Sequence, residues 1–387
     1  MNPDPLMMKH LQRQLRRRER GMVRMLGQFV RCESPSHQKA AVDRLGKLIA
    51  SEWRRRGAKV SVLRDKTRGD SVRAEIWLGD GRPKGQIMVL GHLDTVYPLG
   101  TLATMPFRVE GGRAFGPGTF DMKAGLVLAL SAIDALCALR LRPKKRLVFF
   151  WNSDEEIGSY SSRALIEREA RQSDAVLVLE PAAGPEGRLK TGRKGIGTAE
   201  IIVTGRSAHA GLDPGAGINA VLELALQIAR LKDLNNSRRG IAVQATVIAG
   251  GTVSNVVPHH ARAELDIRFT HLADAPKIER QLRALRPILP GARVDVRGGI
   301  NRPPLERTPA VAALFDHAKK RMRELGQTLD ETSVGGGSDG NFTAALGVPT
   351  LDGLGATGNG AHSAVEHVII RSLPERAALL AGLLATL

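Results

Sequence analysis

The chain has 387 residues, 42% of them hydrophobic, which is enough for two domains with a core each. Its 57 lysine and arginine residues outnumber 39 acidic residues, so the formal net charge is +18. Basic residues are scattered, aromatic residues make up only 4%, and no apolar run reaches the ~20 residues of a membrane span, so neither nucleic acid nor a membrane is expected as a partner.

The first 20 residues are polar and rich in arginine, without a following apolar segment or small-residue cleavage site, so we expect a cytoplasmic protein. The densest basic run, residues 13–24, is typical of one solvated helix face. Cys32 and Cys137 lie far apart, which predicts neither a disulfide nor a thiolate zinc site.

Strands alternate with helices in the first half of the chain. Helical spacing of apolar residues predicts helices at 36–57, 122–139 and 161–170. Apolar runs bounded by turn residues predict strands at 60–63, 74–78, 86–90, 147–151 and 175–179. This alternation is typical of an α/β fold with a largely buried sheet.

The alternation of strands and helices changes after Gly192, in a stretch that contains several glycines. Six elements follow, in the order strand 198–203, helix 217–231, strands 241–248 and 262–269, helix 277–285 and strand 293–296. This is the split βαβ order of a ferredoxin-like domain. The α/β pattern then resumes with helix 308–325, strand 349–351 and helix 373–384. We therefore expect an inserted domain at 195–304 between two segments of the first domain, 1–194 and 305–387.

An acidic triplet, Asp154-Glu155-Glu156, follows the apolar strand 147–151. The carboxyl ends of buried strands are where open α/β sheets place their ligand sites. Three crowded carboxylates repel one another unless a cation lies among them. The triplet therefore indicates a metal site, and the alternative is a solvated acidic turn.

Other strand ends supply further ligand candidates. His92 and Asp94 follow strand 86–90 and share a face, so the carboxylate could fix the tautomer of a metal-binding imidazole. The alternative is a surface His-x-Asp turn. Glu180 closes strand 175–179 in the same way.

Two candidates lie in glycine-rich loops. Asp121 immediately precedes a helix and is either an N-cap or a carboxylate that bridges two metal ions. His362 lies in the loop 358–363.

The candidate ligands together comprise two imidazoles and three carboxylates: His92, Asp121, Glu156, Glu180 and His362. Nitrogen and oxygen ligands without thiolate suit Zn²⁺, with Co²⁺ or Mn²⁺ as substitutes. A bridging Asp121 would give a two-metal site with ions about 3.5–4 Å apart. Glu155 could then carry a proton from the metal-bound water to the leaving amine, while Asp154 supports the turn.

Several motifs together resemble those of the M20 family of metallopeptidases, and most of all its glutamate carboxypeptidase branch. They are Gly91-His92-Leu93-Asp94, Gly118-Thr119-Phe120-Asp121-Met122-Lys123, Asp154-Glu155-Glu156, Glu180-Pro181, Ser207-Ala208-His209-Ala210-Gly211 and Gly335-Gly336-Gly337-Ser338-Asp339. The resemblance implies a zinc-peptidase-like catalytic domain, with a mixed sheet between helices, and an inserted ferredoxin-like domain that acts as lid and dimerisation domain.

The resemblance also implies a division of the ligands. One zinc would be held by His92, Asp121 and Glu180, and the other by Asp121, Glu156 and His362. Glu155 is implied as the general base and Asp94 as the residue that orients the first histidine.

Substrate recognition is implied for residues of the insertion. His209 would stabilise the oxyanion in the active site of a partner subunit, which implies a homodimer. Asn255 and Arg268 would contact the substrate carboxylate, and backbone N–H groups of Gly336 and Gly337 could do the same. The alternatives are an ordinary strand charge for Arg268 and a tight turn for the glycine loop.

The implied activity is cleavage of an amide bond that releases a C-terminal amino acid, glutamate by the most similar branch, from a peptide or an N-acyl amino acid. An N-acyl-amino-acid deacylase of the acetylornithine deacetylase or succinyl-diaminopimelate desuccinylase type would use the same metals. More distant alternatives are a non-catalytic binding protein of this fold and a nucleic-acid-binding protein.

Overall fold

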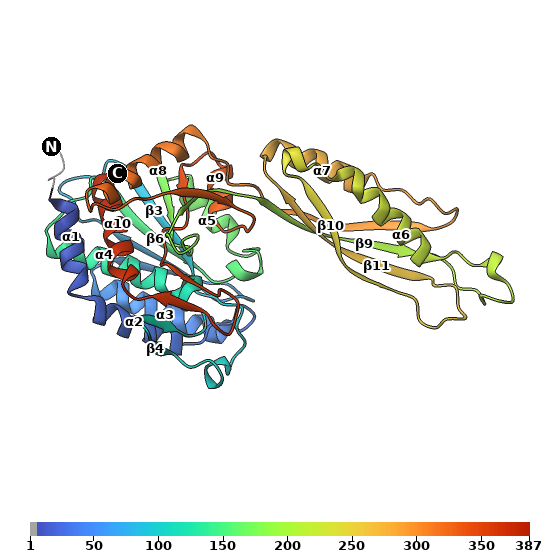
Figure 1. Cartoon of the computed structure of the whole chain (residues 1–387), viewed down its shortest axis with the longest axis horizontal. Coiled ribbons are helices and arrows are strands. Elements are labelled where there is room, and N and C mark those ends of the chain that lie inside the picture. Colours follow the sequence, from blue (N-terminus) through green and yellow to red (C-terminus); the bar gives the residue numbers. More distant parts are fainter. Residues whose placement is uncertain (1–5) are drawn as a thin grey trace. The chain divides into compact units, whose positions relative to one another are not determined.

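A computed structural model describes residues 6–387, which divide into two compact units (Figure 1). Unit 1 comprises the chain up to Gly192 together with Arg307–Ser333 and Ser338–Leu387, and unit 2 comprises Arg193–Glu306 and Val334–Gly337. Residues 334–337 thus lie with the insertion, whereas the sequence placed them in the closing segment of the first domain.

Unit 1 contains a six-stranded mixed sheet. Its strand order is β1 (Lys59–Leu63), β2 (Ser71–Ile76), β6 (Arg146–Asn152), β3 (Gln86–His92), β7 (Ala175–Val178) and β14 (Thr350–Leu351). Strands β6, β3, β7 and β14 are mutually parallel, while β1 and β2 join antiparallel. The predicted α/β fold with a mixed sheet is confirmed.

Helices cover both faces of this sheet (Figure 1). They are α1 (Met7–Arg16), α2 (Glu19–Arg31), α3 (Lys39–Arg55), α4 (Ala124–Ala138), α5 (Arg163–Ala170), α8 (Pro309–Arg323), α9 (Gly340–Ala345) and α10 (Ser372–Thr386). Along β6, Phe149 packs into the core shared with α4, and Phe150 packs with Ile166 of α5 on the opposite face. This burial on both faces explains the continuous apolar runs of the central strands. The single basic helix expected at 13–24 is wrong, because the chain breaks between α1 and α2.

Short strands complete unit 1. A four-stranded sheet has the order β15 (Gly358–Asn359), β16 (His367–Ile369), β5 (Arg113–Phe115) and β4 (Arg108–Glu110), and β8 (Leu189–Arg193) pairs with β13 (Glu331–Val334). These strands have two to five residues, too few for a clear periodic pattern in the sequence.

Unit 2 is a four-stranded antiparallel sheet with two helices. Its elements are β9 (Gly195–Thr204), α6 (Ala220–Arg230), β10 (Ala242–Gly250), β11 (His260–Phe269), α7 (Ala275–Arg283) and β12 (Arg293–Arg302). The strand order β10-β11-β9-β12 is that of a ferredoxin-like domain, as expected. Residues such as Ile201, Leu224 and Ile278 form a core between the sheet and both helices.

Within residues 6–387, no helix combines the length and the apolar character needed to cross a membrane.

Candidate metal centre

Three parallel strands bring their carboxyl ends to one edge of the main sheet. His92, the last residue of β3, pairs with Asn152, the last residue of β6. Strand β7 runs parallel to β3 on its other side and leads to Glu180. Asp121 comes from the segment Thr119–Lys123 before α4, and His362 comes from the loop between β15 and β16.

The first group of possible metal ligands consists of His92, Asp121 and Glu180, whose ligand atoms lie within 4.8 Å of one another. His92 Nε2 is 3.2 Å from Asp121 Oδ1 and 3.4 Å from Glu180 Oε1. The His92 side chain is only 1% exposed. One imidazole nitrogen therefore faces two carboxylates in a largely dry corner.

The second group shares Asp121 and adds Glu156 and His362. His362 Nε2 is 3.4 Å from Asp121 Oδ2 and 3.1 Å from Glu156 Oε2. The two oxygens of Asp121 therefore face different histidines, one in each group. This is the arrangement of a carboxylate that bridges two cations.

An orphaned atom supports the fit of a cation. Glu156 Oε1 is buried and has no hydrogen-bond partner among residues 6–387. A buried carboxylate oxygen without a donor is costly unless a cation neutralises it. The donor set of two imidazoles and three carboxylates suits a borderline divalent ion such as Zn²⁺. The residues present therefore fit two divalent metal ions.

The electrostatics of the second group favour positive charge between its carboxylates. Burial raises the pKa of Glu156 to about 7, and the nearby charge of Asp121 adds to this, although His362 opposes it. Hydrogen bonds to Asp121 and Glu156 raise the pKa of His362 to about 10, against the effect of burial. Both shifts show that the carboxylates attract a cation, which is a proton or a metal ion.

Asp94 faces His92 with both its backbone carbonyl and its carboxylate, and its role in orienting the imidazole stays a prediction. His92 Nδ1 lies 3.0 Å from the backbone carbonyl of Asp94 and 3.5 Å from its Oδ1, so the carbonyl is the closer acceptor. The Asp94 carboxylate instead accepts the hydroxyl of Ser36 at 2.7 Å and the N–H groups of Glu155 and Glu156 at 3.2 Å each. Asp94 thus connects the end of β3 with the acidic turn that follows β6.

The three residues of the acidic triplet have different surroundings: Asp154 supports the turn, whereas Glu155 and Glu156 lie at the candidate metal site. Asp154 is buried and accepts hydrogen bonds from the N–H and hydroxyl of Ser161 and the hydroxyl of Ser162, which confirms its role in the turn. Glu155 and Glu156 begin the 3₁₀ turn Glu155–Ile157. Glu155 is half-buried beside the ligand candidate Glu156, and its role as a general base stays a prediction.

The other candidates, His209, Asn255, Arg268, Gly336 and Gly337, all lie in unit 2. His209 is exposed, and its Nδ1 accepts the N–H groups of Gly211 and Leu212 at 3.1 Å each. The ring proton therefore resides on Nε2, which is a hydrogen-bond donor. Asn255 is adjacent, because its carbonyl accepts the N–H of Ala210 at 2.9 Å.

Arg268 forms a salt bridge with Asp266 of the same strand, β11. Its guanidinium binds Asp266 through Nε at 2.9 Å and Nη2 at 2.8 Å, and Nη1 donates to the carbonyl of Gly335 at 3.2 Å. The geometry therefore favours the ordinary strand charge over a preformed carboxylate site, although it places Arg268 next to the glycine loop. The carbonyls of Gly336 and Gly337 accept from Arg193 Nη1 at 3.0 and 2.9 Å.

Two residues behind the ligands were missed from the sequence. Glu366 is buried and accepts the backbone N–H of Asp121 at 2.9 Å, and Tyr97 donates its hydroxyl to Glu366 at 2.5 Å. The only sequence signal was an acid among apolar residues four positions after His362, and Tyr97 gave none.

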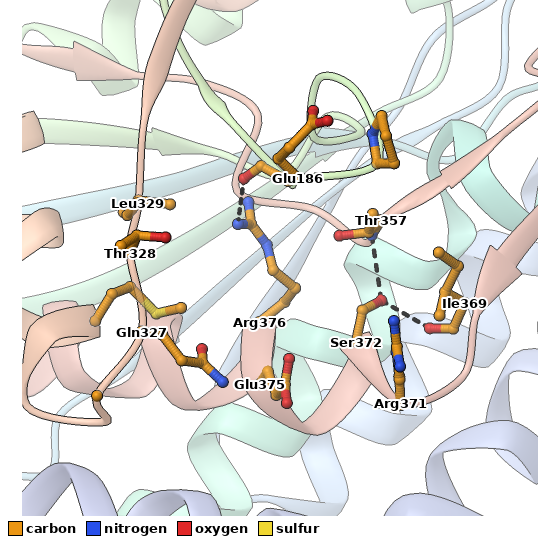
Figure 2. A pocket seen from close by; sticks show the side chains of 14 residues that line it. Glu186, Gln327, Thr328, Leu329, Thr357, Ile369, Arg371, Ser372, Glu375 and Arg376 are labelled. Atoms are coloured by element: carbon orange, nitrogen blue, oxygen red, sulfur yellow. Dashed lines mark hydrogen bonds between the residues drawn. The ribbon is translucent and has the colours of Figure 1, made fainter.

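A separate cavity of about 410 Å³ in unit 1 contains none of the predicted site residues. Figure 2 shows Arg376 and Ser372 of α10 among its lining side chains. Arg376 is buried and donates to the carbonyls of Gly187 at 2.9 Å, Gly355 at 2.8 Å and Gly353. The Arg376 guanidinium therefore stabilises the loops that carry these carbonyls, and its charge is not available to bind a ligand in the cavity.

Comparison with known proteins gives consistent matches. Residues 88–386 match the model of peptidase family M20/M25/M40. The chain is 32% identical over 374 residues to carboxypeptidase G2 of Pseudomonas sp. (strain RS-16), a match that covers 95% of this chain and 89% of that protein. It is 29% identical over 339 residues to succinyl-diaminopimelate desuccinylase of Rhodopseudomonas palustris (strain BisB5), covering 79% and 83%. The solved structure of aminopeptidase PepT from Bacillus cereus ATCC 10987 has the same fold, with a TM-score of 0.77 at 22% identity over 95% of this chain and 98% of that chain.

Proposed function

Because the chain belongs to peptidase family M20/M25/M40, and is thus an enzyme of the metallocarboxypeptidase and amidohydrolase type, we propose that it is a two-metal hydrolase that releases a C-terminal amino acid. The substrate would be a peptide or an N-acyl amino acid. The observation that carries this proposal is the position of Asp121, whose Oδ1 faces His92 and whose Oδ2 faces His362.

The proposed site assigns a task to each residue. His92, Asp121 and Glu180 would hold one ion, and Asp121, Glu156 and His362 the other. Two Zn²⁺ ions, with Co²⁺ or Mn²⁺ as substitutes, would supply Lewis acidity and lower the pKa of bound water towards ~7. Glu155 would accept the proton of the attacking water and deliver it to the leaving amine. Asp94 would hold Glu155 in place through its N–H.

Unit 2 is proposed to be the lid and dimerisation domain, inserted at about residues 195–304 into the catalytic domain. Its edge strand β10 exposes Val247 (45%) and Ile248 (61%), and helix α6 exposes Val221 (39%) and Leu222 (49%) beside it. Gly250 of β10 lies against Val221 of α6, since a Cβ at position 250 would contact the Val221 side chain, so the strand and the helix are in contact there. An unpaired strand edge with apolar neighbours is suited to a second copy of the chain.

Residues of unit 2 are proposed to contact the substrate. His209 presents a donor at Nε2, which suits an oxyanion formed in the partner subunit. Asn255, Arg268, Gly336 and Gly337 would bind the substrate carboxylate, and for this Arg268 must exchange Asp266 for the substrate. The 32% identity to carboxypeptidase G2 supports a carboxypeptidase, and glutamate as the released amino acid stays a prediction from the resemblance of the motifs. The cytoplasmic location and the absence of nucleic-acid and membrane partners stay predictions.

A second candidate is an N-acyl-amino-acid deacylase. It is supported by the 29% identity to a succinyl-diaminopimelate desuccinylase. The same metal ligands and the same Glu155 would serve it, because both reactions hydrolyse an amide. The two candidates differ in which side of the amide the enzyme recognises.

The deciding experiment is a hydrolysis screen with the zinc-loaded enzyme and a Glu155→Gln control. Peptides that end in different amino acids are compared with N-acetyl and N-succinyl amino acids. A preference for the C-terminal residue supports the carboxypeptidase, whereas a preference for the acyl group supports the deacylase. Wild-type protein that binds no metal, or a Glu155→Gln variant with wild-type turnover, would contradict both.

A further inference from the structure

Glu366 lies at the centre of a buried hydrogen-bond cluster behind the metal ligands. Its side chain is fully buried. Oε1 accepts the N–H groups of Phe120 at 2.7 Å and Asp121 at 2.9 Å. Oε2 accepts the N–H of Gly118 at 3.1 Å and the hydroxyl of Tyr97 at 2.5 Å. One carboxylate thus accepts four donors, three of them from the backbone around the bridging Asp121.

The same residue also fixes the loop that carries His362. The backbone carbonyl of Glu366 accepts the N–H of Gly116 at 3.2 Å, and its own N–H donates to the carbonyl of Ser363 at 3.2 Å. The Tyr97 hydroxyl lies 3.0 Å from that same Ser363 carbonyl. Glu366 therefore joins two segments more than 240 residues apart, each of which supplies one ligand of the second group.

The ligands differ in how the fold holds them. His92 ends a fully buried strand in the centre of the main sheet, and Glu180 follows the neighbouring strand β7. Asp121 has non-helical backbone angles inside its segment, and His362 lies in a loop with φ of 61° and a half-exposed side chain. The sheet can position the first two ligands, whereas the last two depend on contacts outside regular structure.

We propose that Glu366 is a positioning residue that holds the backbone of Asp121 and the loop of His362 in one geometry, and so determines how tightly the second metal ion is retained. This inference rests on the proposed two-metal function. The proposal concerns the ion of the second group more than the ion of the first. Only the second group has two ligands, Asp121 and His362, on the segments that Glu366 joins.

The chemistry requires a carboxylate and not only a side chain of this size. An ionised carboxylate can accept all four donors, because each oxygen offers two lone-pair sites. A glutamine has the same shape, but its amide nitrogen would face either the Phe120 and Asp121 N–H groups or the Gly118 N–H and the Tyr97 hydroxyl. Either orientation leaves backbone N–H groups facing the amide NH2: those of Phe120 and Asp121 in one, and that of Gly118 in the other, where the Tyr97 hydroxyl can still donate to the Ser363 carbonyl. The substitution therefore loosens residues 118–121 from the loop of His362 while keeping the volume of the core.

The test compares metal retention in wild type and Glu366→Gln at buffered free Zn²⁺, with elemental analysis for stoichiometry and the Co²⁺ absorption spectrum for geometry. We expect the second ion to bind about 10- to 100-fold more weakly, as for other residues that position metal ligands. We expect the first ion to bind as in wild type. The kcat should fall as the second ion is lost, and excess metal should restore part of the kcat.

Glu223→Gln is the matched control. Glu223 is also fully buried and accepts backbone N–H groups, from Ile288 and Leu289, but it lies in unit 2. Its variant should retain both ions even if it is less stable than wild type. A fall in metal retention equal to that of Glu366→Gln would show a general effect of lost buried hydrogen bonds and would overturn the proposal.

Tyr97→Phe provides a second measurement if Glu366→Gln does not fold. It removes one of the four donors and should weaken the second ion in the same direction by a smaller factor. The proposal is overturned if the folded variants bind both ions as wild type does, or if they lose both ions equally. Wild type that holds fewer than two ions would contradict the proposed two-metal function instead.

Discussion

The carboxylate of Asp94 accepts the backbone N–H of Glu155 at 3.2 Å, so a residue two positions after β3 fixes the turn after β6. An Asp94→Asn variant keeps the shape but replaces one acceptor oxygen with a donor. The turn with Glu155 should then move relative to the metal ligands, and kcat should fall about 10- to 100-fold while both metal ions stay bound. Steady-state kinetics and metal analysis measure this, and an unchanged kcat would show that Asp94 has no positioning role.

Glu155 and Glu156 are neighbours with different expected roles. Glu156→Ala removes a ligand of the second group and should lower metal content from two ions towards one. Glu155→Gln should keep both ions and lose turnover by about 100-fold or more, because the proton carrier is gone. Metal analysis of both variants beside their kcat values separates the roles. If Glu155→Gln lost metal as Glu156→Ala does, Glu155 would be a ligand.

The sequence located the candidate ligands better than their surroundings, for a physical reason. Parallel strands with continuous apolar runs are recognisable, and their carboxyl ends must lie at one edge, so His92, Glu156 and Glu180 could be placed together. The contact of Glu366 with Asp121 joins residues 245 positions apart through irregular loops, and no periodic pattern encodes it. The partner of Arg268 could not be predicted either, because an arginine that pairs with an acid of its own strand and an arginine that binds substrate have the same sequence pattern.

The pH dependence of the metal-free protein follows from two raised pKa values. Glu156 has a pKa of about 7 instead of its ordinary 4.5, so the stability from its bound proton is complete below pH 4.5 and is lost as the pH rises through 7. Because the side chain is only 5% exposed, solvent screens it little, and the difference between 4.5 and 7 corresponds to about 3 kcal/mol. His362, with a pKa of about 10 instead of 6.5, loses its contribution in the same direction between pH 6.5 and 10.

Zinc should reverse this trend, because metal ions bind the deprotonated ligands. The increase in Tm on adding Zn²⁺ should therefore be small at about pH 5 and larger at about pH 8. Thermal unfolding with and without metal across this range tests it, and Glu156→Gln, which removes both a titrating carboxyl group and a proposed ligand, should show a smaller zinc-induced increase at pH 8 than wild type. A zinc-induced increase that is the same at both pH values would contradict the metal assignment.

Arg376 should matter for stability although it lies outside the metal site. Burial lowers its pKa to about 10, so it stays charged at neutral pH. Arg376→Met leaves the carbonyls of Gly187, Gly353 and Gly355 without their donor, and the free energy of unfolding should fall by at least about 3 kcal/mol. Denaturant unfolding measures this, and Arg371→Met, which changes an exposed residue of the same cavity, should cost less than about 0.5 kcal/mol.

The apolar edge of unit 2 gives the last prediction. Ile248 is 61% exposed on the edge strand β10, so Ile248→Asp should leave the fold of unit 2 intact while placing a charge in the proposed dimer interface. We expect the dimer to dissociate at least about 100-fold more readily, as one buried unpaired charge costs about 3 kcal/mol or more. Light scattering over a dilution series measures this.

Leu272→Asp is the matched control for the interface, because Leu272 is a 43% exposed apolar residue of unit 2 outside β10 and α6. It should leave the dimer unchanged. If His209 completes the partner's site, the monomeric Ile248→Asp variant should retain both metal ions but lose kcat to the level of His209→Ala, and combining the two substitutions should cost little more. A monomeric variant with full kcat would show that each subunit works alone, and a monomeric wild type would remove the interface altogether.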